Sequence, residues 1–213
     1  RSAATYDDGP IVVHVLTEKG RGYAPAEDDD EKHFHDIAIF DPATGSESAN
    51  HKGASYTKTF TNILLESAEN DPKIVAITAA MPGSTGLIPF QKRFPDRFFD
   101  VGIAEQHALT SAAGMARAGL RPVVAIYSTF LARAFDQALY DVGLHRLPVI
   151  FCIDRAGITG ADGASHHGIF DISMYARIPG MTIFAPSSIQ ELEIMFREAL
   201  NITAGPTAIR WPK

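Results

Sequence analysis

The chain has 213 residues, of which 46% are hydrophobic and 21% charged, and its formal net charge is −6 at pH 7. This composition is typical of a globular protein with one sizeable core and room for an appended segment. The negative charge argues against nucleic acid as a partner. No run of about 18 apolar residues is present that would span a membrane.

The single cysteine and the N-terminal residues predict a cytoplasmic location. Cys152 lies in the apolar run Val-Ile-Phe-Cys-Ile at residues 149–153. A cysteine in such a run is expected to be a buried strand residue rather than half of a disulfide. The first eight residues lack the apolar core of a signal peptide.

The first 54 residues differ in composition from the rest of the chain. Residues 10–17 form one strand-like run, and the turn-rich sequence Lys-Gly-Arg-Gly-Tyr follows at 19–23. Residues 26–54 are polar and hold an acidic cluster, which is typical of a linker or surface loop. Because a single strand before a linker has no partner, we expect residues 10–17 to pair with a sheet outside this chain.

From about residue 55, apolar strands alternate with helical patterns. Strands are predicted at 73–79, 98–103, 122–127, 147–154, 181–185 and 207–211, and helices near 60–68 and over 104–118, 130–145 and 188–201. Strands of nearly continuous apolar character, separated by helices, are typical of an α/β fold. The sequence therefore predicts a mostly parallel sheet with helices on both faces over residues 55–213.

Chemistry-bearing side chains follow the predicted strands, and ligands of such sheets bind beyond the carboxyl ends of the strands. Glu105 begins an alanine-rich helix among apolar neighbours, with no cationic partner nearby in the sequence. Burial would favour its neutral form and let it share a proton near neutral pH. Alternatively, it is a surface carboxylate that complements a helix N-terminus.

Two further segments are open to two interpretations each. Phe130 either stacks on a planar ligand or belongs to the core, and Arg133 either binds a carboxylate or phosphate or pairs with Asp136 or Asp141. The glycine-rich loop at 154–168 holds two histidines beside acidic and basic residues. It suits proton transfer on a small polar substrate, or it is a capping loop with surface histidines.

No sequence pattern predicts a metal site in this chain. His33 and His35 would point to opposite sides of an extended segment. Cysteines and carboxylates have no convincing metal-ligand spacing, and the glycine-rich nucleotide motifs and the serine-hydrolase motif are absent.

Several motifs together resemble one enzyme family. They are Lys-Gly-Arg-Gly-Tyr at 19–23, Val-Gly-Ile-Ala-Glu-Gln-His-Ala at 101–108, Ile-Tyr-Ser-Thr-Phe-Leu at 126–131, Asp-Arg-Ala-Gly at 154–157, Gly-Ala-Asp-Gly at 160–163, and the closing residues 205–213. In this order they resemble the 1-deoxy-D-xylulose-5-phosphate synthases, which are thiamine-diphosphate enzymes of the transketolase superfamily. The pattern departs from the family at His167, where glutamine is usual, and at Lys213, where arginine is usual.

The resemblance implies roles for particular residues. Glu105 would hydrogen-bond to N1′ of the cofactor's aminopyrimidine, Phe130 would stack on that ring, and Ile103 would pack near the cofactor. The remaining implied site residues are His166 and His35 as catalytic groups, and Tyr127, Arg155, Asp162, Lys213 and Lys19 as substrate-binding groups.

The resemblance also implies an activity and a domain organisation. The family condenses pyruvate with D-glyceraldehyde 3-phosphate and releases CO2, using thiamine diphosphate and Mg²⁺, in isoprenoid and thiamine biosynthesis. Residues 1–25 would be the last strand and turn of a diphosphate-binding domain that is otherwise absent, 26–54 a linker, and 55–213 the pyrimidine-binding domain. The Mg²⁺ ligands would lie in the missing domain, and the chain alone would therefore be inactive. The resemblance also implies that the whole enzyme is a homodimer.

Two alternatives remain at this point. The chain could belong to transketolase itself or to the β-chain of a 2-oxoacid dehydrogenase, since all of these share the fold that carries the glutamate. It could also be a non-catalytic interaction domain built on the same scaffold. The loop with His166 and the segment from Tyr127 to Phe130 favour the synthase.

Overall fold

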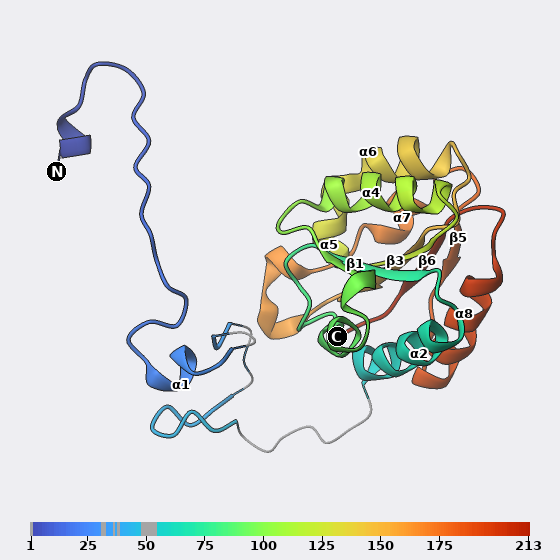
Figure 1. Ribbon diagram of the computed structural model, residues 1–213, viewed down its shortest axis with the longest axis horizontal. Coiled ribbons are helices and arrows are strands. Elements are labelled where there is room, and N and C mark those ends of the chain that lie inside the picture. Colours follow the sequence, from blue (N-terminus) through green and yellow to red (C-terminus); the bar gives the residue numbers. More distant parts are fainter. Residues whose placement is uncertain (1, 31–32, 36, 38, 48–54) are drawn as a thin grey trace. The chain divides into compact units, whose positions relative to one another are not determined.

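The computed structural model describes residues 2–30, 33–35, 37, 39–47 and 55–213. The chain divides into two compact units, Arg1–His51 and Lys52–Lys213 (Figure 1). Part of the predicted linker over 26–54, namely positions 31–32, 36, 38 and 48–54, lies outside the described residues. No helix in the described part of the chain is both long enough and apolar enough to cross a membrane.

The described residues of the first unit form two short helices and a small aromatic cluster. A 3-10 helix spans Ser2–Thr5, and α1 spans Ala24–Glu27. The ring of Phe34 lies 5.7 Å from that of Tyr23 and 5.1 Å from that of Phe40, both in edge-on geometry. The hydroxyl of Tyr23 donates to the carbonyl of Pro42 at 2.9 Å. The polar composition of this segment did not predict these contacts.

The strand predicted at residues 10–17 is not formed in this unit. The structure assigns these residues no regular secondary structure, and side chains such as Val12 and Leu16 are exposed. A β-strand exists through the hydrogen bonds it makes with a neighbour, and no described segment of the chain pairs with residues 10–17. The prediction that a partner sheet lies elsewhere stays a prediction.

The second unit is built on one six-stranded sheet in which every neighbouring pair is parallel. This confirms the predicted α/β fold. The order is β2-β1-β3-β4-β6-β5. The strands are β1 (Ile74–Thr78), β2 (Phe98–Asp100), β3 (Arg121–Tyr127), β4 (Ile150–Asp154), β5 (Thr182–Phe184) and β6 (Thr207–Arg210). All six carboxyl ends therefore lie at the same edge of the sheet.

Helices cover both faces of the sheet (Figure 1). One face carries α2 (Tyr56–Asn70), α3 (Ile88–Arg93) and α8 (Ile189–Asn201). The other carries α4 (Glu105–Arg117), α5 (Ser128–Leu131), α6 (Phe135–Gln137), a π-helix (Ala138–Gly143) and α7 (Asp171–Tyr175). Short 3-10 helices occur at Pro95–Arg97, Ala132–Ala134, Gly160–Asp162 and Ala164–His166.

The prediction of a single helix over residues 130–145 is wrong, because several short helices of different types occupy this region. Here α5 gives way to a 3-10 turn, α6 and the π-helix, in which the amide of Leu144 donates to the carbonyl of Leu139. Apolar spacings of three and four residues are compatible with all of these helix types, so periodicity could not separate them. Helix α7 and helix α3 were not predicted.

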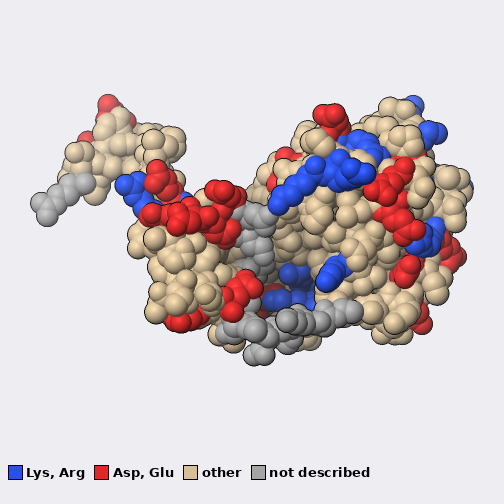
Figure 2. All heavy atoms as spheres, turned by 60° about the horizontal axis from the view of Figure 1, so that its bottom comes forward, with Lys and Arg blue, Asp and Glu red and all other residues tan. Residues whose placement is uncertain are grey.

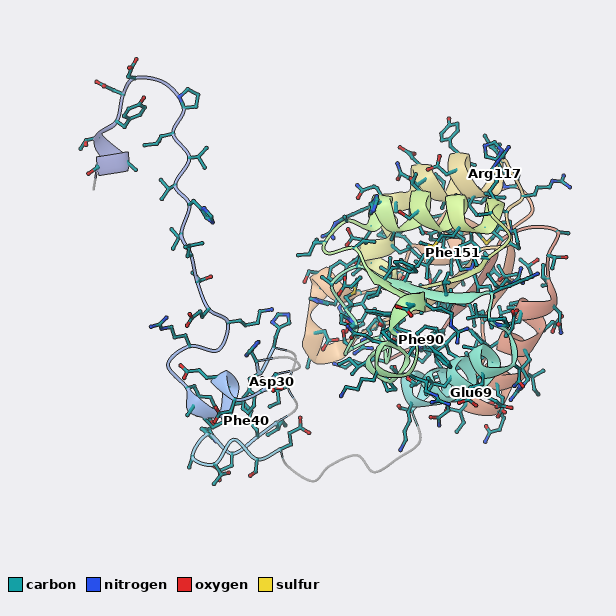
Figure 3. All side chains as sticks on the ribbon, viewed as in Figure 1. Asp30, Phe40, Glu69, Phe90, Arg117 and Phe151 are labelled. Carbon is teal, nitrogen blue, oxygen red and sulfur yellow. The ribbon has the colours of Figure 1, made fainter. Side chains whose placement is uncertain are left out.

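Each face of the sheet has its own hydrophobic core. Figure 3 shows Phe151 on one side of the sheet and Phe90 on the other, while Glu69 and Arg117 point outward from the helices. Trp211, just after β6, is fully buried, and its ring lies 5.1 Å from that of Phe60 on α2. These two cores hold the sheet rigid and so fix the positions of its carboxyl ends.

Candidate active site

Glu105 is the first residue of α4 and is only 2% exposed. It follows a turn in which the amide of Ala104 donates to the carbonyl of Gly102, whose φ of +71° favours glycine. The interpretation of Glu105 as a surface carboxylate is therefore wrong. Its side chain is buried beneath the carboxyl edge of the sheet.

Arg133 supplies the cationic partner that the local sequence did not show. Its Nη1 lies 2.5 Å from Oε1 of Glu105, although the two residues are 28 positions apart. The arginine side chain is 49% exposed, so that it reaches from solvent to the buried carboxylate. The structure pairs Arg133 with Glu105 rather than with Asp136 or Asp141, and its binding of a ligand's carboxylate or phosphate stays a prediction.

Three aromatic rings lie on the Arg133 side of this ion pair. Phe130 stacks on Tyr127 with ring centroids 5.7 Å apart and an interplanar angle of 12°. The ring of His166 meets Phe130 edge-on at 5.3 Å, and the Arg133 guanidinium lies 5.0 Å from the Phe130 ring. Phe130 is half-buried and also packs against the core. It is thus part of the core and part of the site edge at once.

The carboxyl end of β4 carries a buried ion pair. Asp154 is fully buried and Arg155 is 7% exposed, and Nη1 of Arg155 donates to Oδ2 of Asp154 at 2.9 Å. The Arg155 guanidinium also lies 4.4 Å from the ring of Tyr127, the residue that pairs with Asp154 in the β3–β4 register. Burial raises the pKa of the Asp154 carboxyl, while the neighbouring guanidinium opposes that rise.

The two adjacent histidines of the 154–168 loop have different surroundings. The ring of His166 faces Phe130 and Tyr127, and its Nδ1 lies 3.0 Å from Oγ of Ser165. The ring of His167 instead accepts a hydrogen bond at Nδ1 from the backbone amide of Thr159, at 3.1 Å. Of the two, His166 is therefore the histidine placed against the aromatic pair.

An ion pair joins Asp162, in the middle of the 154–168 loop, to Lys213. Nζ of Lys213 lies 2.5 Å from Oδ1 of Asp162. The two predicted substrate-binding residues are thus brought together as an ion pair, in which Asp162 partly neutralises the lysine. The loop is closed at its base by reciprocal backbone hydrogen bonds between Gly157 and Gly168, each 2.8 Å long.

The remaining predicted site residues are exposed. Ile103 is 80% exposed, two residues before Glu105. Lys19 and His35 are exposed residues of the Arg1–His51 unit. Their role beside the site of the second unit stays a prediction.

Sequence reasoning missed Arg133 as the partner of Glu105, Asp154 and Ser84 as the partners of Arg155, and Thr57 as a partner of Asp154. Arg155 donates to the carbonyl of Ser84 at 2.7 Å, and Thr57 donates to Asp154 at 3.1 Å. A signal existed only for Asp154, which directly follows an apolar run. The other partners come from distant segments without a distinctive motif.

Comparison with known proteins identifies the second unit. Residues 52–213 match the family described as "Transketolase, pyrimidine binding domain". The chain is 58% identical over 205 residues to the 1-deoxy-D-xylulose-5-phosphate synthase of Mycobacteroides abscessus, covering 96% of this chain and 32% of that protein. It is 55% identical over 213 residues to the synthase of the same name from Mycobacterium tuberculosis, covering all of this chain and 33% of that one.

Solved structures give the same fold. A split-gene transketolase described as an inactive β4 tetramer is 33% identical, with a TM-score of 0.65 over 74% of this chain and 51% of that chain. The transketolase of Campylobacter jejuni, at 22% identity and a TM-score of 0.68 over 75% of this chain and 26% of that chain, supports the fold alone. The chain spans about a third of the length of the curated relatives it matches.

Proposed function

Since the chain belongs to the family of transketolase pyrimidine-binding domains, we propose that it is the cofactor-activating part of a 1-deoxy-D-xylulose-5-phosphate synthase. The 58% identity to a protein of that name supports this choice over transketolase. The reaction would join pyruvate to D-glyceraldehyde 3-phosphate with loss of CO2, in the biosynthesis of isoprenoids and thiamine.

The single observation that carries the proposal is that the Arg133 guanidinium contacts both the buried carboxylate of Glu105 and the ring of Phe130. A carboxylate and an aromatic face within reach of one guanidinium fit a planar, nitrogen-containing ring. The exposed side chain of Ile103 adds an apolar contact at the same edge. These residues fit the aminopyrimidine half of thiamine diphosphate.

The residues would divide the work of holding that cofactor. Glu105 would hold a proton shared with N1′ of the aminopyrimidine, and Phe130 would orient the ring by stacking. Arg133 supplies the positive charge that keeps the buried carboxylate of Glu105 partnered. When bound, thiamine diphosphate supplies the acidic carbon that becomes the nucleophile toward pyruvate.

The acceptor would bind on the side of the 154–168 loop. His166 would move a proton at its ring nitrogen, and the contact of its ring with that of Phe130 supports this role. Arg155 and Lys213 offer positive charge for the acceptor's phosphate, and Tyr127 and Asp162 offer polar contacts to its hydroxyls. On the face shown in Figure 2, basic side chains lie among acidic ones. Binding of a small anion such as the acceptor's phosphate would therefore depend on individual basic residues.

The diphosphate and its Mg²⁺ would be held outside this chain. Among the described residues no group of three or more His, Cys, Asp or Glu side chains could hold a metal ion. We expect the chain alone to lack turnover; the split-gene transketolase that it resembles is described as inactive. Lys19 is proposed to bind substrate and His35 to act in catalysis, and the whole enzyme would be a cytoplasmic homodimer.

The test is an assay of the full-length protein that contains this chain. CO2 release and formation of 1-deoxy-D-xylulose 5-phosphate are measured with pyruvate, thiamine diphosphate and Mg²⁺, with and without D-glyceraldehyde 3-phosphate. We expect acceptor-dependent product, and a loss of about 10²- to 10⁴-fold in kcat for Glu105→Gln. The matched control is Glu69→Gln, which changes an exposed glutamate on α2 and is expected to keep normal turnover.

Two outcomes would contradict the proposal. Turnover of a ketose donor in place of pyruvate would assign the chain to transketolase. No turnover of either substrate pair, together with unchanged thiamine diphosphate binding in Glu105→Gln, would favour a non-catalytic domain on the same scaffold.

A further inference from the structure

The carboxylate of Asp154 uses both of its oxygens within the protein. Oδ1 accepts a hydrogen bond from the backbone amide of Arg155 at 2.7 Å. Oδ2 accepts from Nη1 of Arg155 at 2.9 Å and from the hydroxyl of Thr57 at 3.1 Å. Asp154 thus binds the next residue twice, once through its backbone and once through its side chain.

Arg155 needs this support because of its backbone conformation. Its φ of +57° lies in the left-handed region, which a residue with a side chain seldom adopts. From there Nη1 also donates to the carbonyl of Ser84 at 2.7 Å, and the guanidinium lies 4.4 Å from the ring of Tyr127. Its Nε is buried and has no hydrogen-bond partner among the described residues. The guanidinium is therefore aimed by a few contacts, of which Asp154 makes the charged one.

The same ring of Tyr127 connects Arg155 to the cofactor side of the site. Tyr127 stacks on Phe130, and Phe130 lies against His166 and the Arg133 guanidinium. A change in the position of the Arg155 guanidinium would thus alter its contact with the Tyr127 ring, which stacks on Phe130. Cation–π contacts of this kind are stronger when they are desolvated.

We propose that Asp154 is a positioning residue that fixes the Arg155 guanidinium for the acceptor's phosphate. The role in acceptor binding rests on the proposed function, whereas the effect on the guanidinium does not. Burial works against the ionised carboxyl of Asp154. The desolvation of a buried ion pair offsets much of its Coulombic gain, so the pair is weak evidence for a role in stability.

The kinetic test uses the full-length enzyme with Asp154→Asn, which keeps the size of the side chain and removes its charge. KM and kcat are measured with D-glyceraldehyde 3-phosphate and with D-glyceraldehyde, which lacks the phosphate. We expect KM for the phosphorylated acceptor to rise about tenfold or more, since a charge-assisted contact is weakened. KM for the unphosphorylated acceptor should stay the same.

The matched control is Asp171→Asn. Asp171 is also buried, and its Oδ2 lies 2.7 Å from Nε of Arg210, so this variant breaks a comparable ion pair. We expect it to affect both acceptors equally. If Asp154→Asn also affects both acceptors equally, or changes neither KM, the positioning role is overturned.

A crystal structure of the Asp154→Asn enzyme gives a readout that is independent of activity. The proposal expects the Arg155 guanidinium to leave the Ser84 carbonyl and the Tyr127 ring. A guanidinium found unmoved would overturn the proposal even in an active enzyme. Absence of synthase turnover in the wild type would instead contradict the proposed function, and the structure of the variant would still decide the role of Asp154.

Discussion

Nη1 of Arg133 lies 2.5 Å from Oε1 of Glu105, which joins a half-exposed cation to a carboxylate that is almost completely buried. The glutamate begins α4, and the arginine lies in the 3-10 turn after α5. A buried carboxylate without a partner is costly, because it loses its hydration. The ion pair therefore explains how a charged group can lie beneath the carboxyl edge of the sheet.

We predict that Arg133→Met lowers the free energy of unfolding by about 1 kcal/mol, because Glu105 loses its partner. The effect should be much smaller when Glu105→Gln is present as well, since no buried charge is then left unpaired. Urea unfolding followed by circular dichroism measures both. The control Arg93→Met removes an exposed ion pair with Glu69. It should change the free energy of unfolding by no more than about 0.5 kcal/mol. Additive effects of the two site substitutions would contradict the coupling.

The aromatic contact between α2 and the end of β6 should contribute strongly to stability. Phe60 is fully buried against Trp211 and Phe196. We expect Phe60→Ala to lower the free energy of unfolding by about 3–5 kcal/mol, because it leaves a cavity in the core. Thermal and urea unfolding measure the loss. Ile194→Ala on the exposed side of α8 should change stability by no more than about 0.5 kcal/mol.

Two glycines should respond oppositely to replacement by alanine. A Cβ on Gly168 would lie 2.4 Å from the Ser128 side chain and 2.5 Å from the carbonyl oxygen of Arg155. Gly168→Ala is therefore expected to destabilise the protein by about 1–3 kcal/mol. A Cβ added at Gly114, inside α4, would lie in open space. Gly114→Ala should therefore raise the free energy of unfolding by about 1 kcal/mol, because alanine has the higher helix propensity. A comparison of the two unfolding temperatures tests the close approach at Gly168.

The thiol of Cys152 should be unreactive in the folded protein. It is completely buried in β4, and burial raises its pKa well above the usual value. The unfolded chain therefore loses this proton at a lower pH than the folded chain. The contribution of the thiol to stability is present below about pH 8.5 and is lost as the pH rises above it, by up to about 1.4 kcal/mol per pH unit.

This loss is measured as the difference between the wild type and Cys152→Ala in urea unfolding at several pH values. The stability of the wild type should fall more steeply above pH 8.5 than that of the variant. A thiol reagent at pH 8 should label Cys152 only after unfolding. Rapid labelling of the native protein would contradict its burial.

The sequence determined the parallel sheet and the place of its site. Nearly continuous apolar runs such as residues 122–127 and 149–153 can only be buried on both faces of a sheet, and they became β3 and β4. Because parallel strands end at one edge, the position of Glu105, Tyr127 and Arg155 after strands was enough to bring them to that edge. The burial of Cys152 followed from the same pattern.

Only the tertiary structure decided which side chains are partners. Arg133 reaches Glu105 across 28 residues, and Thr57 reaches Asp154 across 97. Neither pair could be predicted, because periodicity reports the burial of a segment and not the segment that covers it. Likewise, residues 10–17 have the composition of a strand, but no segment among the described residues pairs with them. Local patterns fix which face of an element is buried, whereas ion pairs and strand pairing depend on distant segments that only the folded chain brings together.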